Sequence, residues 1–459
     1  MTPYEHFSVL LEESFPALVT SLQRLIRIKS VNTAPEDGCP FGRGIRNCLT
    51  ECLSLGAAFG FRTKDMDGMC GYVEYGAGEE MAAVLTHLDV VPEGDGWQYP
   101  PYGAEIIDGK LYGRGSVDDK GPAIAALYAL KTLKDSGAPL QRRIRVIFGC
   151  NEELGSRCMT YYAASGEEMP VLGFTPDAGY PIINGEKGSL TLLFKRPFAS
   201  AGECRIISLI GGKGANVVPD TADAFVAFSC DAENMPDHAE DKLTFSSDDG
   251  CLHIHADGVS AHAARPQGGE NAIGRLLLQL STLPLAGEQK DAIAFLAEKF
   301  GIEVYGEALG LCQHDDISGE LTVNLGMISL DNGVLSIHLN IRTPVTANVE
   351  MIHAQLCSLM TENGFEEAEA KIKAPLYVPP DSVLVQKLSA AFEGMTGEKA
   401  YTRTISGGTY AKEMPNVVAF GPNWPGEPPL IHRANEYMEL EKLKKHVRIT
   451  AAAMYELAR

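Results

Sequence analysis

Two nearly continuous apolar runs with a helix-type segment between them constrain the fold more than any other feature of this chain. Residues 82–91 (AAVLTHLDVV) and 143–149 (RIRVIFG) are typical of strands that are buried on both faces. Residues 121–137 predict a helix, with Pro122 in its first turn and Gly137 just past its end. This order favours an α/β fold, with a mostly parallel central sheet and helices on both faces.

The pattern of polar and apolar residues changes near residue 185. Short segments there alternate polar and apolar residues in the strand manner, and helical stretches follow at 270–282 and 349–363. The last part of the chain returns to the α/β pattern of the first part and ends in a helix from about residue 437. With 459 residues, more than one domain is expected. We predict a first catalytic part at 1–184, an inserted α+β domain at 185–379 and a second catalytic part at 380–459.

Composition excludes several classes of partner. The chain has 39 basic and 60 acidic residues, a formal net charge of −21, which repels nucleic acid. The first 28 residues show no secretion signal and predict an amphipathic helix that is broken near Pro16. No stretch approaches the roughly 20 apolar residues of a membrane span. The eleven cysteines are scattered without a CxxC pair, which indicates free thiols and a cytoplasmic location.

The first segment that carries chemistry is THLD, at the end of the first apolar run. Residues two apart on a strand face the same side, so His87 and Asp89 are expected to lie together. The imidazole of His87 can bind a metal while Asp89 fixes the orientation of the ring. The alternative is an ordinary core histidine paired with a nearby carboxylate.

The second segment, GRGSVDDKG at 113–121, is a tight glycine-containing loop followed directly by a helix. A carboxylate at this helix start could bridge two cations, and we choose Asp118 for that role. Asp119 is expected to cap the helix, and the alternative is that either acid is only a cap. The segment lacks the GxxxxGK[ST] pattern of a phosphate-binding loop.

The third segment, NEELGS, follows the second apolar run. Adjacent acids point in different directions, so one of Glu152 and Glu153 can bind a metal while the other acts as a general base on water. The alternative is a pair of exposed glutamates in a turn. Asp177, in TPDA, and His432, in IHR, add further ligands of the kind that zinc and manganese accept.

Taken in chain order, these motifs resemble the aminoacylase and carnosinase family of metallopeptidases, and most closely its PepV-type dipeptidase branch. The matching segments are HLD, GRGSVDDKG, NEELGS, TPDA, GVSAHAARP, SGGTYAKEMPN and IHRANEYM. The resemblance implies a catalytic domain that binds two Zn²⁺ ions, alternatively Mn²⁺, and that is interrupted by a lid domain.

The resemblance also implies a role for each matching residue. One metal would be held by His87, Asp118 and Asp177, and the second by Asp118, Glu153 and His432. Glu152 would be the general base, Asp89 would support His87, and His262 would stabilise the oxyanion from the lid. Substrate contacts would come from Asn216, Arg342, Gly407, Gly408 and Thr409.

The sequence therefore predicts a metal-dependent enzyme that hydrolyses free dipeptides, with β-alanyl and D-amino-acid dipeptides among the candidates. One alternative is a deacylase of the acetylornithine deacetylase or succinyl-diaminopimelate desuccinylase type, which would share the metal centre. Another is a non-catalytic metal-binding protein, although a protein that only binds metal needs no general base such as Glu152. A serine hydrolase is disfavoured because GxSxG is absent. A monomer without nucleic-acid or membrane partners is expected, with a homodimer as the alternative.

Overall fold

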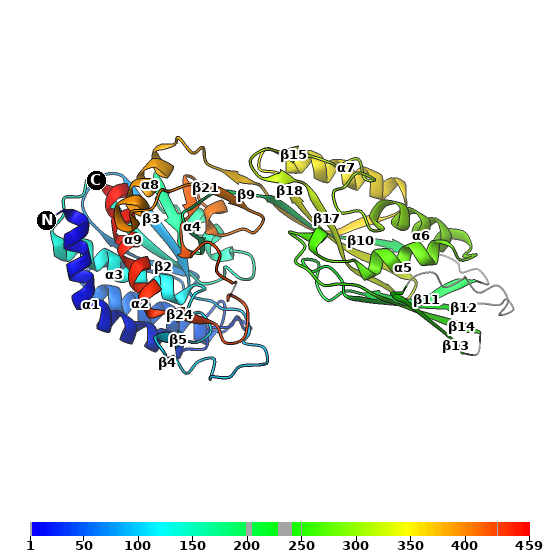
Figure 1. Ribbon diagram of the computed structural model, residues 1–459, viewed down its shortest axis with the longest axis horizontal. Coiled ribbons are helices and arrows are strands. Elements are labelled where there is room, and N and C mark those ends of the chain that lie inside the picture. Colours follow the sequence, from blue (N-terminus) through cyan, green and yellow to red (C-terminus); the bar gives the residue numbers. More distant parts are fainter. Residues whose placement is uncertain (1, 199–203, 228–240, 249, 429) are drawn as a thin grey trace. The chain divides into compact units, whose positions relative to one another are not determined.

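The computed structural model describes residues 2–198, 204–227, 241–248, 250–428 and 430–459. The chain forms two compact units, coloured along the sequence in Figure 1. Unit 1 comprises Met1–Gly185, Val378–Thr404 and Gly408–Arg459, and unit 2 comprises Glu186–Tyr377 and Ile405–Gly407. Among the described residues, no helix combines the length and the apolar character that a membrane span needs.

Unit 1 is built around a central sheet with the strand order β1-β2-β6-β3-β7-β22-β9. The middle strands β6, β3, β7 and β22 are parallel to one another, whereas β1, β2 and β9 pair in the antiparallel sense. Every residue of β3 is buried, which explains the apolar run. The strands of this unit are β1 (Arg62–Met66), β2 (Cys70–Tyr75), β3 (Met81–His87), β4 (Glu105–Ile107), β5 (Lys110–Tyr112), β6 (Arg143–Gly149), β7 (Leu172–Thr175), β8 (Ala178–Gly179), β9 (Ile182–Glu186), β21 (Thr402–Ile405), β22 (Val417–Ala419), β23 (Pro422–Asn423) and β24 (Tyr437–Glu439).

Helices cover both faces of this sheet. On one face α2 packs against β2, where a Cβ atom on Gly56 would come within 2.3 Å of Val73. On the other face α4 reaches the sheet through Tyr162, whose hydroxyl accepts a hydrogen bond from Arg145. The helical segments are α1 (Pro3–Ile26), α2 (Arg43–Ala58), α3 (Lys120–Ser136), α4 (Arg157–Ala164), α8 (Val383–Thr396), η3 (Tyr410–Lys412) and α9 (Leu440–Ala458).

The expected break of the N-terminal helix near Pro16 is wrong, because α1 continues through this residue. Proline inside a helix removes one hydrogen bond and costs roughly 3 kcal/mol. Large apolar side chains before and after it lie on one buried face, and each contributes roughly 1.5–3 kcal/mol on burial. Their burial outweighs the local cost of the proline. These residues are Phe7, Leu11, Leu18, Leu22 and Leu25.

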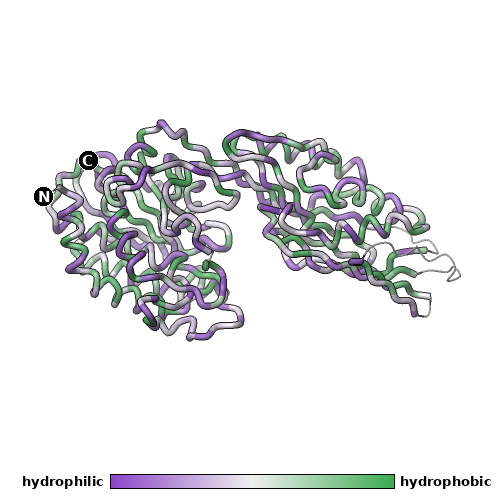
Figure 2. Tube along the Cα trace, viewed as in Figure 1, coloured by the Kyte–Doolittle hydropathy of each residue, from purple (hydrophilic) through white to green (hydrophobic). Residues whose placement is uncertain are grey.

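Unit 2 contains an antiparallel sheet with the strand order β13-β14-β12-β11-β17-β18-β10-β19. Alternate residues of its strands form an apolar core with α5, α6 and α7, and Figure 2 shows the hydropathy along each element. The helices expected at 270–282 and 349–363 are confirmed as α5 and α7, whereas α6 was not predicted. The elements are β10 (Gly188–Pro197), β11 (Arg205–Gly211), β12 (Thr221–Ala227), β13 (Leu243–Asp248), β14 (Cys251–Asp257), η2 (Pro266–Gly268), α5 (Ala272–Ser281), α6 (Gly287–Phe300), β15 (His314–Asp315), β16 (Gly319–Glu320), β17 (Thr322–Asp331), β18 (Val334–Thr343), α7 (Val349–Glu362), β19 (Glu366–Lys373) and β20 (Leu376–Tyr377).

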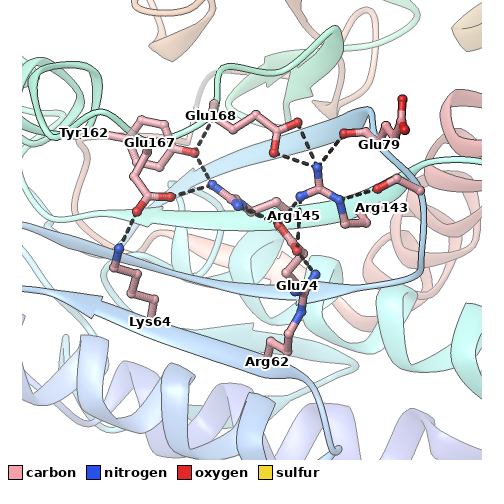
Figure 3. Close-up of polar contacts among 10 residues, drawn as sticks. Arg62, Lys64, Glu74, Glu79, Arg143, Arg145, Tyr162, Glu167 and Glu168 are labelled. Atoms are coloured by element: carbon pink, nitrogen blue, oxygen red, sulfur yellow. Dashed lines mark hydrogen bonds and ion pairs between the residues drawn. The ribbon is translucent and has the colours of Figure 1, made fainter.

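A buried glutamate joins β2 to β6 in unit 1. Glu74 is 3% exposed and lies among three arginines, Arg62, Arg143 and Arg145 (Figure 3). Its carboxylate lies 2.7 Å from the Nε of Arg145 and 3.3 Å from a guanidinium nitrogen of Arg143. A buried carboxylate is tolerated because its charge and its lone pairs are matched in this way.

Removing this carboxylate should destabilise unit 1 strongly. We expect Glu74→Ala to lower the free energy of unfolding by about 3–5 kcal/mol, because the buried Arg145 would lose its nearer carboxylate partner and keep only Glu167, at 3.0 Å. Glu80 is the matched control: it pairs with Arg142 at 2.7 Å but is 54% exposed. Glu80→Ala should cost less than about 1 kcal/mol. Urea unfolding followed by circular dichroism measures both, and equal losses would contradict the role given to Glu74.

Candidate metal centre

Six metal-type side chains gather in unit 1 at one edge of the central sheet. Parallel strands present their carboxyl ends at the same edge, which is where ligands bind in α/β folds. β3 ends at His87, the loop after β6 carries Glu152, and the loop after β7 carries Asp177. The structure thus brings together all the residues that the sequence analysis named as ligands or base, namely His87, Asp118, Glu152, Glu153, Asp177 and His432.

Asp118 occupies the middle of this cluster. Its Oδ1 lies 2.9 Å from Nε2 of His87, and its Oδ2 lies 3.0 Å from Nε2 of His432. The two oxygens of one carboxylate therefore face two different histidines. This is the arrangement that a carboxylate bridging two cations requires.

The remaining acids divide between the two histidines. Asp177 lies 3.8 Å from Nε2 of His87, and Glu153 lies 3.2 Å from Nε2 of His432. Ligand atoms of His87, Glu152 and Asp177 all lie within 4.8 Å of one another, as do those of Asp118, Glu153 and His432. Glu152 thus stands close enough to bind a metal as well as to act as a base.

The donor atoms fit divalent cations. Imidazole nitrogens together with carboxylate oxygens suit zinc and manganese. The Oε1 atom of Glu153 is buried and has no hydrogen-bond partner among the described residues. A buried carboxylate oxygen in that state is costly unless a cation is bound to it.

Charges in the cluster are strongly perturbed without a cation. Burial, followed by the nearby carboxylate of Asp118, raises the pKa of Asp177 to about 7. Burial and the charge of Asp177 also raise the pKa of Glu152 well above its usual range. Hydrogen bonds to Asp118 and Glu153 raise the pKa of His432 to about 10. The negative carboxylates thus favour protonation of neighbouring groups. Bound cations would offset the same negative charge in place of those protons.

Asp89 lies just beyond the end of β3 and supports the cluster in two ways. Its backbone oxygen accepts a hydrogen bond from Nδ1 of His87 at 3.0 Å. Its carboxylate accepts the backbone N–H groups of Glu152 at 3.0 Å and Glu153 at 3.1 Å. One residue therefore orients the imidazole and also holds the loop that carries both glutamates.

The expectation that Asp119 caps a helix with its side chain is wrong. Asp119 occupies the N-cap position of α3 but makes no side-chain capping hydrogen bond. Its carboxylate instead accepts the backbone N–H of His87 at 3.0 Å. Satisfying this buried N–H at the end of β3 fixes the backbone at His87.

Sequence reasoning missed Glu436 and Arg114, which connect two of the ligand-bearing segments. Glu436 is buried, and its carboxylate accepts the N–H groups of Val117 at 2.9 Å and Asp118 at 3.3 Å. It also lies 2.8 Å from Arg114, which donates to the backbone oxygen of Arg433. The only sequence signal was an acid four residues after His432 and an arginine inside the glycine-containing loop.

Glu436 should therefore control metal binding without touching a metal. We expect Glu436→Gln to weaken metal binding about 10–100-fold, because the amide cannot neutralise Arg114 or accept all the loop N–H groups. Glu441→Gln, an exposed site on α9, is the control. Metal titration with circular dichroism as a check on folding measures the effect. A folded Glu436→Gln protein with unchanged metal affinity would contradict this role.

The predicted substrate-binding residues fall in both units. His262, Asn216, Arg342 and Gly407 lie in unit 2, whereas Gly408 and Thr409 lie in unit 1. In unit 2 the N–H of Ala263 donates to the backbone oxygen of Asn216 at 2.9 Å, which keeps the segments of Asn216 and His262 adjacent. Arg342, on β18, donates to Oδ1 of Asn340 at 3.0 Å and to the backbone oxygen of Ser406 at 3.1 Å. In unit 1 the Thr409 hydroxyl accepts the N–H of Ala411.

Comparison with known proteins identifies the family. The sequence model of peptidase family M20/M25/M40 matches residues 83–456. The chain belongs to this family. YtjP of Bacillus subtilis strain 168, provisionally named a dipeptidase, is 40% identical over 457 residues, which cover 96% of this chain and 97% of YtjP. A Staphylococcus aureus (strain MRSA252) protein with the same provisional name is 34% identical over 458 residues, covering 96% of this chain and 97% of that protein.

Solved structures of low sequence identity share the fold. Human carnosine dipeptidase 1 has a TM-score of 0.62 at 16% identity, and the match covers 100% of this chain and 99% of that one. The di-peptidase Dug1p of Saccharomyces cerevisiae also has a TM-score of 0.62, at 13% identity and with the same coverage. The predicted fold class and the resemblance to this metallopeptidase family are confirmed. The M20/M25/M40 chain is thus a hydrolase of the metallopeptidase type.

Proposed function

We propose that this M20-family enzyme hydrolyses free dipeptides with two divalent ions, Zn²⁺ or alternatively Mn²⁺, bound in unit 1. The observation that carries the proposal is Asp118, whose two oxygens face His87 and His432 at 2.9 and 3.0 Å. The dipeptidase name given to YtjP, 40% identical, supports the choice of substrate. In this proposal unit 1 is the catalytic domain and unit 2 is the lid.

The proposed ligand set combines the two groups of donor atoms with the contact between Asp118 and His87, and leaves Glu152 as the base. His87 and Asp177 would hold one ion, Glu153 and His432 the other, and Asp118 both. When bound, such a pair of ions polarises the scissile carbonyl and lowers the pKa of water between them. Both histidines would bind as neutral imidazoles, so metal uptake must displace the proton that the carboxylates otherwise keep on His432.

Glu152 would move the proton during hydrolysis. Burial and the charge of Asp177 raise the pKa of its carboxyl group, which favours the protonated form of Glu152. Glu152 would take a proton from the attacking water and deliver it to the leaving amine. Asp89 would keep the base in place through its hydrogen bond to the Glu152 backbone.

Residues outside the metal set would recognise the substrate. Arg342 offers a planar fork that suits the terminal carboxylate of a dipeptide, and Asn216 would add a second contact to it. Binding of that carboxylate would limit substrate length. His262 would donate a hydrogen bond to the developing oxyanion. The segment of Gly407, Gly408 and Thr409 would line the substrate backbone. Closure of the lid would then be part of the catalytic cycle.

A cytoplasmic location accompanies this proposal. Nine cysteines among the described residues, all those apart from Cys204, are free thiols, and most of them are buried. Free buried thiols are the usual state of cysteine in a reducing compartment.

Substitution of the proposed base separates proton transfer from metal binding. We expect Glu152→Gln to lower kcat about 10²–10⁴-fold while both metal ions remain bound. Glu168→Gln is the control, because the Glu168 side chain is 38% exposed and pairs with Arg143, outside the metal cluster. Metal analysis counts the bound ions, and steady-state kinetics measures kcat. Loss of one ion in Glu152→Gln would make Glu152 a ligand, and normal turnover would remove it from the mechanism.

The proposed activity is tested by a substrate panel. The purified protein is stripped of metal, given Zn²⁺ or Mn²⁺, and assayed with free dipeptides, an N-blocked dipeptide, a tripeptide and N-acetyl amino acids. We expect metal-dependent cleavage of free dipeptides and little cleavage of the other substrates, because binding of the terminal carboxylate by Arg342 would limit substrate length. Cleavage of the acylated amino acids alone would assign a deacylase with the same metal centre. No turnover with either metal would indicate a metal-binding protein.

A further inference from the structure

A second cluster of metal-type side chains lies in unit 2, where helix α7 packs against β19. His353 and Cys357 are four residues apart on α7, so they lie on the same face of the helix. Glu367, on β19, lies opposite both of them. β19 is the last strand of the sheet, and none of these three residues belongs to the set described in unit 1.

The three ligand atoms are close enough to share one ion. Nε2 of His353 lies 2.5 Å from Oε2 of Glu367 and 3.3 Å from Sγ of Cys357. Sγ of Cys357 lies 3.1 Å from the same oxygen of Glu367. Donor atoms on a tetrahedral zinc ion are about 3.3–3.7 Å apart, given metal–ligand distances of about 2.0–2.3 Å. Opening the cluster by a few tenths of an ångström to about 1 Å would admit the ion.

The surroundings allow this adjustment. The side chains of His353 and Glu367 are 24% and 30% exposed, so both can shift without disturbing the core. Solvent can also supply a fourth ligand.

We propose that His353, Cys357 and Glu367 form a separate binding site for a zinc-type divalent cation. The ion would displace the proton of the Cys357 thiol and would take the place of the hydrogen bond between Nε2 of His353 and the Glu367 carboxylate. It would also cross-link the edge strand β19 to α7. The sulfur ligand distinguishes this site chemically from the unit 1 cluster, whose donors are imidazole nitrogens and carboxylate oxygens only.

Cobalt spectroscopy tests the site independently of enzymatic activity. Co²⁺ is added to the metal-free protein, and the near-ultraviolet band of thiolate-to-cobalt charge transfer is recorded. We expect a band whose final amplitude corresponds to one thiolate-bound Co²⁺ per chain, reached once the unit 1 cluster and this site are both filled. The band should disappear in Cys357→Ser and His353→Ala and persist in Cys312→Ser. Cys312 is the matched control because it is exposed and belongs to no such cluster among the described residues. No band in the unaltered protein, or a band that survives Cys357→Ser, would overturn the proposal.

Thiol protection provides a second measurement. Zn²⁺ at ten times its dissociation constant should slow iodoacetamide labelling of Cys357 about tenfold, since only the free thiol reacts. Labelling of Cys312, located by peptide mass spectrometry, should not change. Equal rates at Cys357 with and without Zn²⁺ would mean that the three side chains are only hydrogen-bonded to one another. Neither measurement depends on dipeptide hydrolysis, so the outcome here and that of the proposed activity are independent.

Discussion

The crowding of carboxylates at one edge of the central sheet is the constraint around which unit 1 is organised. Asp118, Asp177, Glu152 and Glu153 lie together with two histidines and are largely removed from water. Isolated burial of so many acids would be strongly unfavourable. Burial raises the pKa of Asp177, and hydrogen bonds to Asp118 and Glu153 raise the pKa of His432. Divalent cations are the natural counter-charge, and the surrounding fold maintains the geometry that they need.

That geometry is maintained by residues which contact the ligands without being ligands. Asp89 holds the backbone of Glu152 and Glu153, Asp119 holds the backbone of His87, and Glu436 holds that of Asp118. Each uses a carboxylate to accept backbone N–H groups at a place where the chain leaves regular secondary structure. Loops alone would position ligands loosely, whereas these buried hydrogen bonds fix the loops to the ends of strands.

The sequence could predict those parts of the molecule that depend on local pattern. The runs at 82–91 and 143–149 revealed the parallel strands, and the metal-type residues were visible because they stood at the strand ends. The parts it could not predict depend on partners distant in the chain. The continuation of α1 through Pro16 depends on tertiary burial of its apolar face, and the roles of Asp119 and Glu436 depend on backbone groups 32 and 318 residues away.

The same reasoning explains why the cluster in unit 2 escaped notice in the sequence. His353 and Cys357 form a common helical pair, and Glu367 is one acid in a strand rich in glutamate. Only the packing of α7 against β19 brings a nitrogen, a sulfur and an oxygen within 3.3 Å of one another. Three unlike donors give such a site a preference for borderline cations such as Zn²⁺ over Mn²⁺, since thiolate favours the softer ion. The hard, carboxylate-rich cluster of unit 1 accepts either ion, so competition between the two metals should separate the sites.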